Sequence, residues 1–143
     1  MIQVEGLSRS FGAIRAIDGV AFEARDGRIT GLLGPNGAGK STTLRILYTV
    51  LRPSAGTARV DGIDVAQDSL ATRRAIGVLP HSAGIYPHLT ARENIAYFGE
   101  LHGLRGGALH NRVDELLVEL EIGEFADRQA KGFSQGERVK VAL

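Results

Sequence analysis

Apolar and polar residues alternate at the start of the chain, which predicts β-strands with one buried face. Ile2 to Leu7 follows this alternation, and the small and polar residues of Ser8 to Gly12 are expected to interrupt it. A second strand is expected around Val20 to Ala24, followed by a turn at Asp26-Gly27. The apolar run Ile29 to Leu33 then predicts a further short strand.

The next segments predict a helix and a β-hairpin. Thr42 to Tyr48 places Leu44 and Leu47 or Tyr48 on one helical face. After a cluster of turn-forming residues, Thr57 to Val60 and Ile63 to Val65 are expected to pair with each other. This pairing would add antiparallel β-structure beside a core.

A short helix and one more strand precede a region, Leu89 to Ile122, that is expected to be helical. Ser69 to Arg74 predicts a short helix, and Ile76 to Leu79 predicts one more apolar strand. Thr90 and Glu93 have the spacing of a capping box, so a helix is expected from there to about residue 102. Leu109 to Glu121 carries an apolar stripe with acidic residues outside it, which predicts another helix.

Two segments outside these elements have more than one interpretation. Ser134 and Glu137 have capping-box spacing, so a helix cap is the simpler interpretation of both. The alternative is that the Ser134 hydroxyl, Gly136 and free helix amides form an anion site. Phe11 is either a local packing residue or a platform on which a base can stack.

The segment Gly34-Pro-Asn-Gly-Ala-Gly-Lys-Ser41 fits the pattern G-x-x-x-x-G-K-[ST]. Its glycines can take positive φ and carry no Cβ, so the backbone N–H groups can point inward at one centre. Lys40 adds a mobile positive charge for phosphate oxygens, and the Ser41 hydroxyl can ligate Mg²⁺. An ordinary Gly-rich turn is the alternative. A nucleotide-phosphate loop is favoured because an apolar strand is expected before the segment and a helix after it.

Composition and charge limit the remaining classes. The 143 residues are 43% hydrophobic and 23% charged, as in globular domains. The net charge of +1 gives no electrostatic case for nucleic acid as the main partner. The absence of Cys excludes disulfides and thiolate metal sites, and no apolar run approaches the roughly 18 residues of a membrane span. We therefore expect a chain of cytoplasmic origin that reaches a membrane only through a partner.

Taken in order, these motifs resemble the ATP-binding subunits of ABC transporters. The resemblance extends over essentially the whole chain and rests on Phe11, the loop Gly34 to Thr42, the segment Ile76 to Pro80 and the helix start Phe133 to Glu137. Phe133-Ser-Gln-Gly-Glu137 looks like a variant of that family's signature, usually written Leu-Ser-Gly-Gly-Gln. Its departures from that signature are similar to the branch of sodium-export and drug-export ATPases.

The resemblance implies a role for each matching residue. Phe11 would stack on adenine, and Ser41 would be the Mg²⁺ ligand. The residues that would hold the phosphates of ATP are Gly34, Pro35, Asn36, Gly37, Ala38, Gly39, Lys40, Ser41 and Thr42. Two cassettes of this family dimerise head to tail, so the residues that would act in trans on the ATP of a partner are Ser134, Gln135, Gly136 and Glu137.

His81 stands where the family usually has a glutamine that contacts Mg²⁺ and the attacking water. A neutral imidazole can accept one hydrogen bond and donate another, but its unperturbed pKa of about 6.5 lets it become charged near neutral pH. A solvent-facing loop histidine is the alternative interpretation. If His81 senses nucleotide, His81→Gln should change the Mg²⁺ dependence of hydrolysis in the complete protein.

The catalytic acids of the family have no counterpart here, because no four apolar residues are followed by Asp-Glu. The switch histidine also has no candidate. The expected fold class is therefore α/β, a P-loop NTPase core of ABC type, truncated before the Walker B strand. Residues 1–88 would form an antiparallel β subdomain with the P-loop core, and residues 89–143 an α-helical subdomain that ends in the signature segment.

The function that the resemblance implies is that of an ABC transporter's ATP-binding subunit, coupling ATP binding and hydrolysis to transport, in this branch export. The partners would be a second cassette and a separately encoded transmembrane permease at the inner face of the cell membrane. The full-length protein would be an ATPase, whereas these 143 residues would bind ATP at most. The alternatives are a soluble ABC-type ATPase that acts on ribosomes or DNA and a non-catalytic truncated product.

Overall fold

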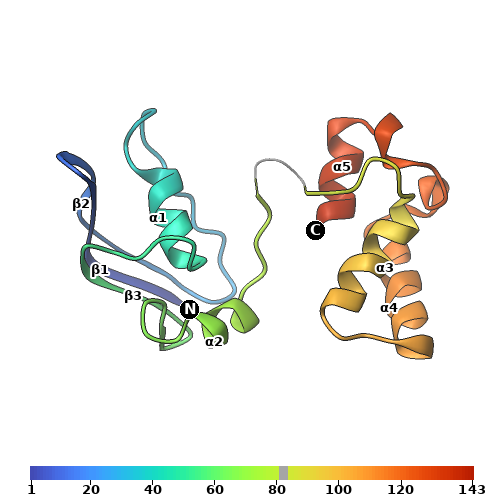
Figure 1. Cartoon of the computed structure of the whole chain (residues 1–143), viewed down its shortest axis with the longest axis horizontal. Coiled ribbons are helices and arrows are strands. Elements are labelled where there is room, and N and C mark those ends of the chain that lie inside the picture. The colour runs from blue at the N-terminus through green and yellow to red at the C-terminus, as the bar shows by residue number, and fades with distance from the viewer. Residues whose placement is uncertain (81–83) are drawn as a thin grey trace. The chain divides into compact units, whose positions relative to one another are not determined.

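The computed structural model of the chain describes residues 1–80 and 84–143. The chain divides into two compact units, unit 1 (Met1–Val78) and unit 2 (Leu79–Leu143) (Figure 1). Each unit has a hydrophobic core of its own. The two units also differ in secondary structure, since unit 1 holds the strands and unit 2 is helical.

Unit 1 is built on a four-stranded sheet with the strand order β2-β1-β3-β4. Its strands are β1 (Ile2–Phe11), β2 (Ile14–Ala24), β3 (Ala55–Val60) and β4 (Ile63–Asp64). All three pairings are antiparallel. β3 and β4 form the predicted hairpin, with Val60 opposite Ile63, so the antiparallel β-structure expected from the sequence is confirmed.

Helices α1 (Lys40–Leu47) and α2 (Ser69–Ala75) complete unit 1. α1 packs against β2 and β3 with Thr43, Ile46 and Leu47 on its buried face. The prediction that Leu44 shares this face is wrong, because Leu44 is 49% exposed. Thr43 tolerates burial because its hydroxyl donates to the Gly39 carbonyl at 3.0 Å. The core residues are Val4, Leu7, Ile17, Ile46, Leu47, Ala58, Val60 and Val65.

Strand β1 is longer than the alternation pattern predicts, and it continues past Ser8 to Phe11. Its pairing with β2 shifts register at several points, which lets the strand accommodate small residues without ending. The segment before β3 supports the far end of β1, since Ser54 N–H donates to the Ser8 carbonyl at 2.8 Å and Ser10 N–H donates to Ser54 Oγ at 3.2 Å. Phe11 therefore ends a strand, opposite Ile14, instead of lying in a loop.

Two predicted strands are not formed in the described structure. Residues 29–33 and 76–79 run without strand pairing, and Ile29 and Leu33 are fully or almost fully exposed. A strand is stable only when a neighbour pairs with its N–H and C=O groups. No described strand is paired with either segment, so their apolar composition alone does not produce sheet.

Unit 2 is helical, as the sequence pattern predicts. Its helices are α3 (Ala91–Leu101), α4 (Gly106–Glu119) and α5 (Gln135–Ala142), and the 3₁₀ helices Gly123–Phe125 and Ala130–Gly132 lie between α4 and α5 (Figure 1). The predicted capping box is present at the start of α3. Glu93 N–H donates to Thr90 Oγ1 at 3.1 Å, and Thr90 N–H donates to Glu93 Oε2 at 2.8 Å.

The core of unit 2 includes the predicted stripe of α4. Leu109, Val113 and Leu117 are buried, and Leu116 and Leu120 pack against them half-buried. The remaining buried residues of this core are Ile85, Ala91, Ile95, Ile122, Ala126, Ala130, Phe133 and Val141. Because Phe133 and Val141 belong to this core, the start of α5 is anchored to the rest of the unit.

Asn94 fixes the loop before α3 to the helix. Its side chain is fully buried, and Tyr86 N–H donates to its Oδ1 at 2.7 Å. Its Nδ2 donates to the carbonyls of Tyr86 and Thr90 at 3.1 and 2.8 Å. Both ends of the buried amide are therefore hydrogen-bonded, as buried polar groups require.

Candidate functional site

The glycine-rich segment forms a loop that leads directly into α1. Gly37 and Gly39 have φ values of 85° and 81°, in the left-handed region that glycine adopts without a Cβ clash. Lys40, the first residue of α1, extends back over the loop, and its Nζ donates to the carbonyls of Gly34 and Pro35 at 2.6 and 2.7 Å. The ammonium group thus lies at the loop itself, where a bound phosphate would meet it.

Gly39 is also the point at which the loop touches the sheet. A Cβ at this position would lie 2.4 Å from the Ala16 carbonyl oxygen and 3.1 Å from Ile17 Cγ1. Only glycine fits this approach, because the nearest atom is rigid backbone of β2. The loop is therefore positioned by a tertiary contact as well as by its own turns.

The first turn of α1 presents hydrogen-bond donors beside Lys40. The backbone N–H groups at a helix start have no carbonyl one turn back, and the first bond of this kind here runs from Thr43 N–H to the Gly39 carbonyl at 2.8 Å. Ser41 is exposed and Thr42 half-buried in the same turn. Free N–H groups, an ammonium group and a hydroxyl oxygen together suit a phosphate with a divalent cation.

Phe11 is the last residue of β1, at the turn into β2. Phe11 pairs with Ile14 of β2, and two residues further along β2 the Ala16 carbonyl lies against Gly39 of the loop. Strand β2 therefore connects Phe11 to the loop. The Phe11 ring is 44% exposed, and the Arg9 guanidinium lies 4.8 Å from its centroid. One face of the ring is thus covered by a cation, an arrangement that the sequence does not predict.

The signature segment begins α5 in unit 2, with Ser134 as the N-cap. Glu137 N–H donates to Ser134 Oγ at 3.2 Å, and Ser134 N–H donates to Glu137 Oε2 at 2.7 Å. The helix-cap interpretation of both residues is therefore confirmed. Gln135 and Gly136 are the first two helical residues, so their N–H groups have no carbonyl one turn back.

Arg128 joins this capping box. Its guanidinium forms a short ion pair with Glu137 Oε1 and lies 5.4 and 5.1 Å from the ring centroids of Phe125 and Phe133. The pKa of Glu137 is lowered, first by the hydrogen bond from the Ser134 backbone N–H and further by the Ser134 side chain and Arg128. Glu137 is therefore a carboxylate with both oxygens engaged.

The predicted site residues thus fall into separate parts of the chain. Phe11 and the loop residues 34–42 lie in unit 1, and Ser134 to Glu137 lie in unit 2. His81 lies outside the described residues.

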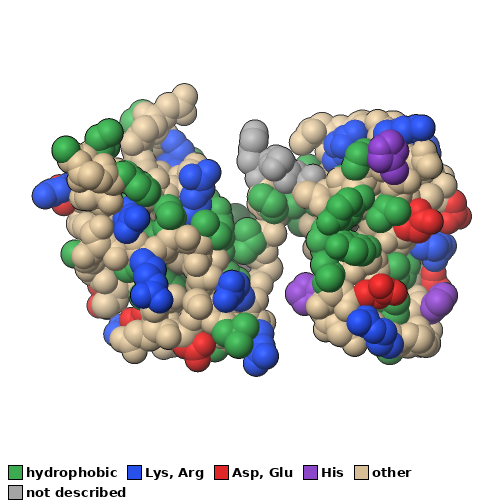
Figure 2. All heavy atoms as spheres, in the orientation of Figure 1, with side chains coloured by type: hydrophobic (Ala, Val, Ile, Leu, Met, Phe, Trp, Pro, Cys, Tyr) green, Lys and Arg blue, Asp and Glu red, His purple; other side chains and the backbone are tan. Residues whose placement is uncertain are grey.

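Unit 2 also carries an exposed aromatic cluster that no sequence motif marks. Tyr86 and Tyr97 meet edge to face with ring centroids 4.9 Å apart, and Phe98 lies 5.5 Å from Tyr97. All three rings are more than a third exposed, and nearby in sequence Leu101 is 65% exposed. Figure 2 shows hydrophobic side chains exposed on the visible surface of this unit.

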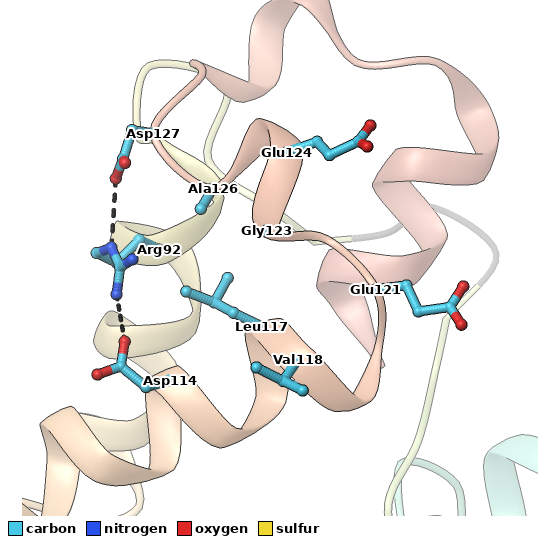
Figure 3. A pocket seen from close by; sticks show the side chains of 9 residues that line it. All are labelled: Arg92, Asp114, Leu117, Val118, Glu121, Gly123, Glu124, Ala126 and Asp127. Carbon is cyan, nitrogen blue, oxygen red and sulfur yellow. Dashed lines mark hydrogen bonds and ion pairs between the residues drawn. The ribbon is translucent and has the colours of Figure 1, made fainter.

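A hollow of about 740 Å³ lies elsewhere on unit 2 (Figure 3). Arg92 bridges Asp114 and Asp127 there, with nitrogen–oxygen distances of 2.6 and 3.2 Å. The hydrogen bond to Asp114 and, to a smaller extent, the one to Asp127 raise the pKa of the Arg92 guanidinium above its ordinary value. Arg92 therefore joins α3 to α4 and to the segment that follows the first 3₁₀ helix.

Sequence reasoning misses Arg9, Arg92 and Arg128, although each contacts a residue of interest. None belongs to a motif with fixed spacing, and their partners lie up to 35 positions away in the sequence, as for Arg92 and Asp127. Asn94 directly follows the predicted capping box of Thr90 and Glu93, but that spacing does not indicate that its side chain is buried. The folded chain is needed to find such contacts.

Comparison with known proteins decides the family. Residues 17–143 match the family model described as ABC transporter. The chain belongs to the ABC transporter family. The resemblance drawn from the phosphate loop and the signature-like helix start is therefore confirmed.

Several relatives are similar over the whole chain. The ABC transporter ATP-binding protein NatA of Bacillus subtilis is 36% identical over 148 residues, which cover 100% of this chain and 60% of NatA. The daunorubicin/doxorubicin resistance ATP-binding protein DrrA of Streptomyces peucetius is 41% identical over 142 residues, or 99% of this chain and 43% of DrrA. The probable sulfate/thiosulfate import ATP-binding protein CysA of Chlorella vulgaris is 37% identical over 142 residues, or 99% of this chain and 60% of CysA. This ABC chain thus spans about half the length of these relatives.

Solved structures share the fold of this ABC chain. An ATP binding subunit of an ABC transporter has a TM-score of 0.81 at 28% identity, covering 99% of this chain and 59% of that chain. A dimeric ATP-binding cassette in a post-hydrolysis state, bound to ADP and Pi, has a TM-score of 0.78 at 27% identity, covering 99% and 68%. These similarities confirm the predicted α/β fold of ABC type.

Among the described residues, no helix combines the length and the apolar character that crossing a bilayer requires.

Proposed function

We propose that this chain provides the nucleotide-binding site of an ABC transporter's ATP-binding subunit, which couples ATP binding and hydrolysis to transport through a separate membrane subunit. The observation that carries the proposal is the loop from Gly34 to Thr42. Its positive-φ glycines, the Lys40 ammonium group over the loop and the free N–H groups of α1 all lie at one place.

Each predicted site residue of unit 1 has a defined role in this proposal. Gly34 to Thr42 surround the phosphates, and Lys40 exchanges its two carbonyl partners for phosphate oxygens when ATP binds. Ser41, exposed in the first turn of α1, offers the hydroxyl that would ligate Mg²⁺. Mg²⁺ would supply positive charge that neutralises the phosphates. Phe11 would stack on adenine with the ring face that Arg9 leaves free.

A second cassette completes the proposed site. Ser134, Gln135 and Gly136 would bind the γ-phosphate held by the loop of a partner copy, since the start of α5 offers a hydroxyl and two free amides. A related cassette that is dimeric and bound to ADP and Pi supports this arrangement. The composite site explains why two anion-binding features occur in one chain.

The proposed membrane partner is a permease that docks on unit 2. The exposed cluster of Tyr86, Tyr97, Phe98 and Leu101 supports a protein partner, because clustered exposed aromatics are typical of interfaces. The protein would then act at the inner face of the membrane without spanning it.

The direction of transport that we propose is export, as the resistance function in the name of DrrA suggests. The import protein CysA is similarly identical to this chain, so overall sequence identity does not distinguish export from import.

This proposal assigns nucleotide binding, but not hydrolysis, to the 143 residues. The 143 residues include the phosphate loop but no apolar strand followed by Asp-Glu, whose acids orient water and hold metal in this family. We therefore expect the 143-residue chain to bind MgATP and to hydrolyse none measurably. The transport function then requires the remainder of a cassette such as those of the longer relatives.

Calorimetric titration of the purified chain with MgATP tests the proposal. Lys40→Ala should abolish binding, because it removes the cation that faces the phosphates. Arg45→Ala is the matched control, since Arg45 is a basic, exposed residue on the same helix. Binding that survives Lys40→Ala, or no binding by the unmodified chain, would contradict the proposed site.

A further inference from the structure

Arg128 lies beside the start of α5, although it belongs to no motif that the sequence marks. Its guanidinium lies over the rings of Phe125 and Phe133 and pairs with Glu137 at the start of α5. The two rings meet edge to face, with centroids 5.2 Å apart. Phe133 is buried, so the cation rests on a fixed aromatic surface beside the helix start.

Glu137 creates an electrostatic problem at this helix start. A carboxylate in the first turn stabilises the helix through the free N–H groups and the dipole. The same carboxylate repels any phosphate that approaches those N–H groups, and the residues offered to the phosphate, Ser134 to Gly136, directly precede it. A glutamate therefore favours the fold of α5 and opposes the binding of an anion there.

We propose that Arg128 is the positioning residue that makes a glutamate at position 137 compatible with a nucleotide phosphate at the start of α5. Its guanidinium holds Glu137 Oε1 while Ser134 N–H holds Oε2, so the carboxylate is kept in the capping box and its charge is balanced. The Ser134 hydroxyl then keeps its own hydrogen to donate to phosphate. This inference rests on the proposed function, because it assumes that ATP of a partner copy reaches this helix.

The side chain at position 128 suits this role for a geometric reason. A guanidinium is planar, so it can stack on aromatic rings and still donate to a carboxylate in its own plane. Arg128 is half exposed and Glu137 one-quarter exposed at their side chains, so the pair is accessible to an approaching ligand. Arg138, by contrast, donates to the carbonyls of Phe133 and Lys131 and makes no contact with Glu137 among those described.

A double-mutant cycle in the protein as its gene encodes it tests the proposal. The measurement is dimer formation driven by Mg²⁺ and adenylyl imidodiphosphate, followed by sedimentation velocity, with Lys40→Ala as the nucleotide-free baseline. Arg128→Gln should weaken nucleotide-driven association about tenfold when residue 137 is Glu, and by less than about threefold when Glu137→Gln is also present. Glu137→Gln alone, which keeps the capping geometry, should strengthen association.

Arg138→Gln is the matched control and should have the same effect in both backgrounds. Equal losses from Arg128→Gln in the two backgrounds would show that Arg128 only packs on the rings, which overturns the inference. If Arg128→Gln does not fold, Glu137→Gln alone decides: unchanged or weaker association overturns the inference. Absence of nucleotide-driven association in the unmodified protein overturns the proposed function, and this failure is visible before any variant is made.

Discussion

The two predicted anion-binding segments, one in each unit, are built in different ways. In unit 1 the loop before α1 depends on contacts between residues that are distant in the sequence, because Gly39 lies against β2. The packing of unit 1 must therefore keep the loop and this strand in contact. In unit 2 the start of α5 depends on near neighbours, since Ser134 and Glu137 satisfy each other within one helical turn. The first site is tertiary in origin and the second is local.

The difference also appears in the flanking segments. Residues 29–33 before the loop are without strand pairing and mostly exposed, whereas Phe133 before α5 is buried in the core of unit 2. A site held by distant contacts is sensitive to changes far from the ligand, and a site held by capping is sensitive mainly to the cap itself. Substitutions in unit 1 and unit 2 should therefore differ in how far their effects spread.

The largest expected effect is that of Gly39→Ala. Its Cβ would overlap the Ala16 carbonyl oxygen at 2.4 Å while φ stays at 81°, so we expect a loss of about 3 kcal/mol or more in the stability of unit 1. ATP binding should be lost with it. Urea unfolding combined with amide hydrogen exchange of α1 gives the measurement.

Gly37→Ala is the control for this prediction. Gly37 has nearly the same φ, 85°, but a Cβ added there would meet no atom within 4 Å, so its cost should be only about 1 kcal/mol. Equal costs at the two positions would mean that the contact with the sheet does not position the loop.

Asn94→Ala should have the next largest effect, about 2 kcal/mol on the stability of unit 2, because it leaves the Tyr86 N–H without its acceptor and removes the buried amide that donates to the Tyr86 and Thr90 carbonyls. Asn111→Ala, at an exposed position of α4, is the control and should change stability by less than about 0.5 kcal/mol. Urea unfolding monitored by helical circular dichroism distinguishes them. A cost of less than about 1 kcal/mol for Asn94→Ala would indicate that the loop before α3 is held by other contacts.

Ser134→Ala should cost about 1 kcal/mol, the usual value of an N-cap, and its effect should be confined to exchange at the first amides of α5. A loss of protection throughout unit 2 would contradict the local origin of this site.

The same capping box predicts a pH dependence. The folded-state pKa of Glu137 lies below its unfolded value of about 4.3, so its contribution is present above that value and is lost as pH falls through the lower folded-state pKa. The free energy of unfolding should therefore fall less steeply with decreasing pH for Glu137→Gln than for the unmodified chain, as acid unfolding curves would show. Identical curves would mean that the carboxylate does not stabilise the folded state.

Apart from the control substitutions, the smallest effect is expected for Arg92→Met, about 1 kcal/mol or less, because the ion pairs with Asp114 and Asp127 are largely exposed. Arg112→Met, which removes only ion pairs within α4, should cost about 0.3 kcal/mol. Thermal unfolding should rank the two in this order, since Arg92 joins three segments and Arg112 joins neighbours on one helix. The reverse order would show that the bridge in the hollow contributes nothing to unit 2.

The sequence alone predicts the features that depend on neighbouring residues. The capping boxes at Thr90 and Ser134 form as expected because both partners lie within one helical turn. The phosphate loop could be recognised for the same reason, since its glycines, Lys40 and Ser41 all lie within the short segment 34–41. The hairpin of β3 and β4 is another local feature, closed by a turn between adjacent strands.

Only the tertiary structure decides which apolar segments become strands, how far β1 extends, and which distant residues reach the candidate site. Residues 29–33 have the composition of a strand, but composition cannot supply a partner for their backbone groups. Gly39 meets Ala16, and Arg128 meets Glu137, through contacts that no fixed spacing in the sequence encodes. Local spacing therefore determines the chemistry that this chain can offer, and long-range packing determines where that chemistry is held.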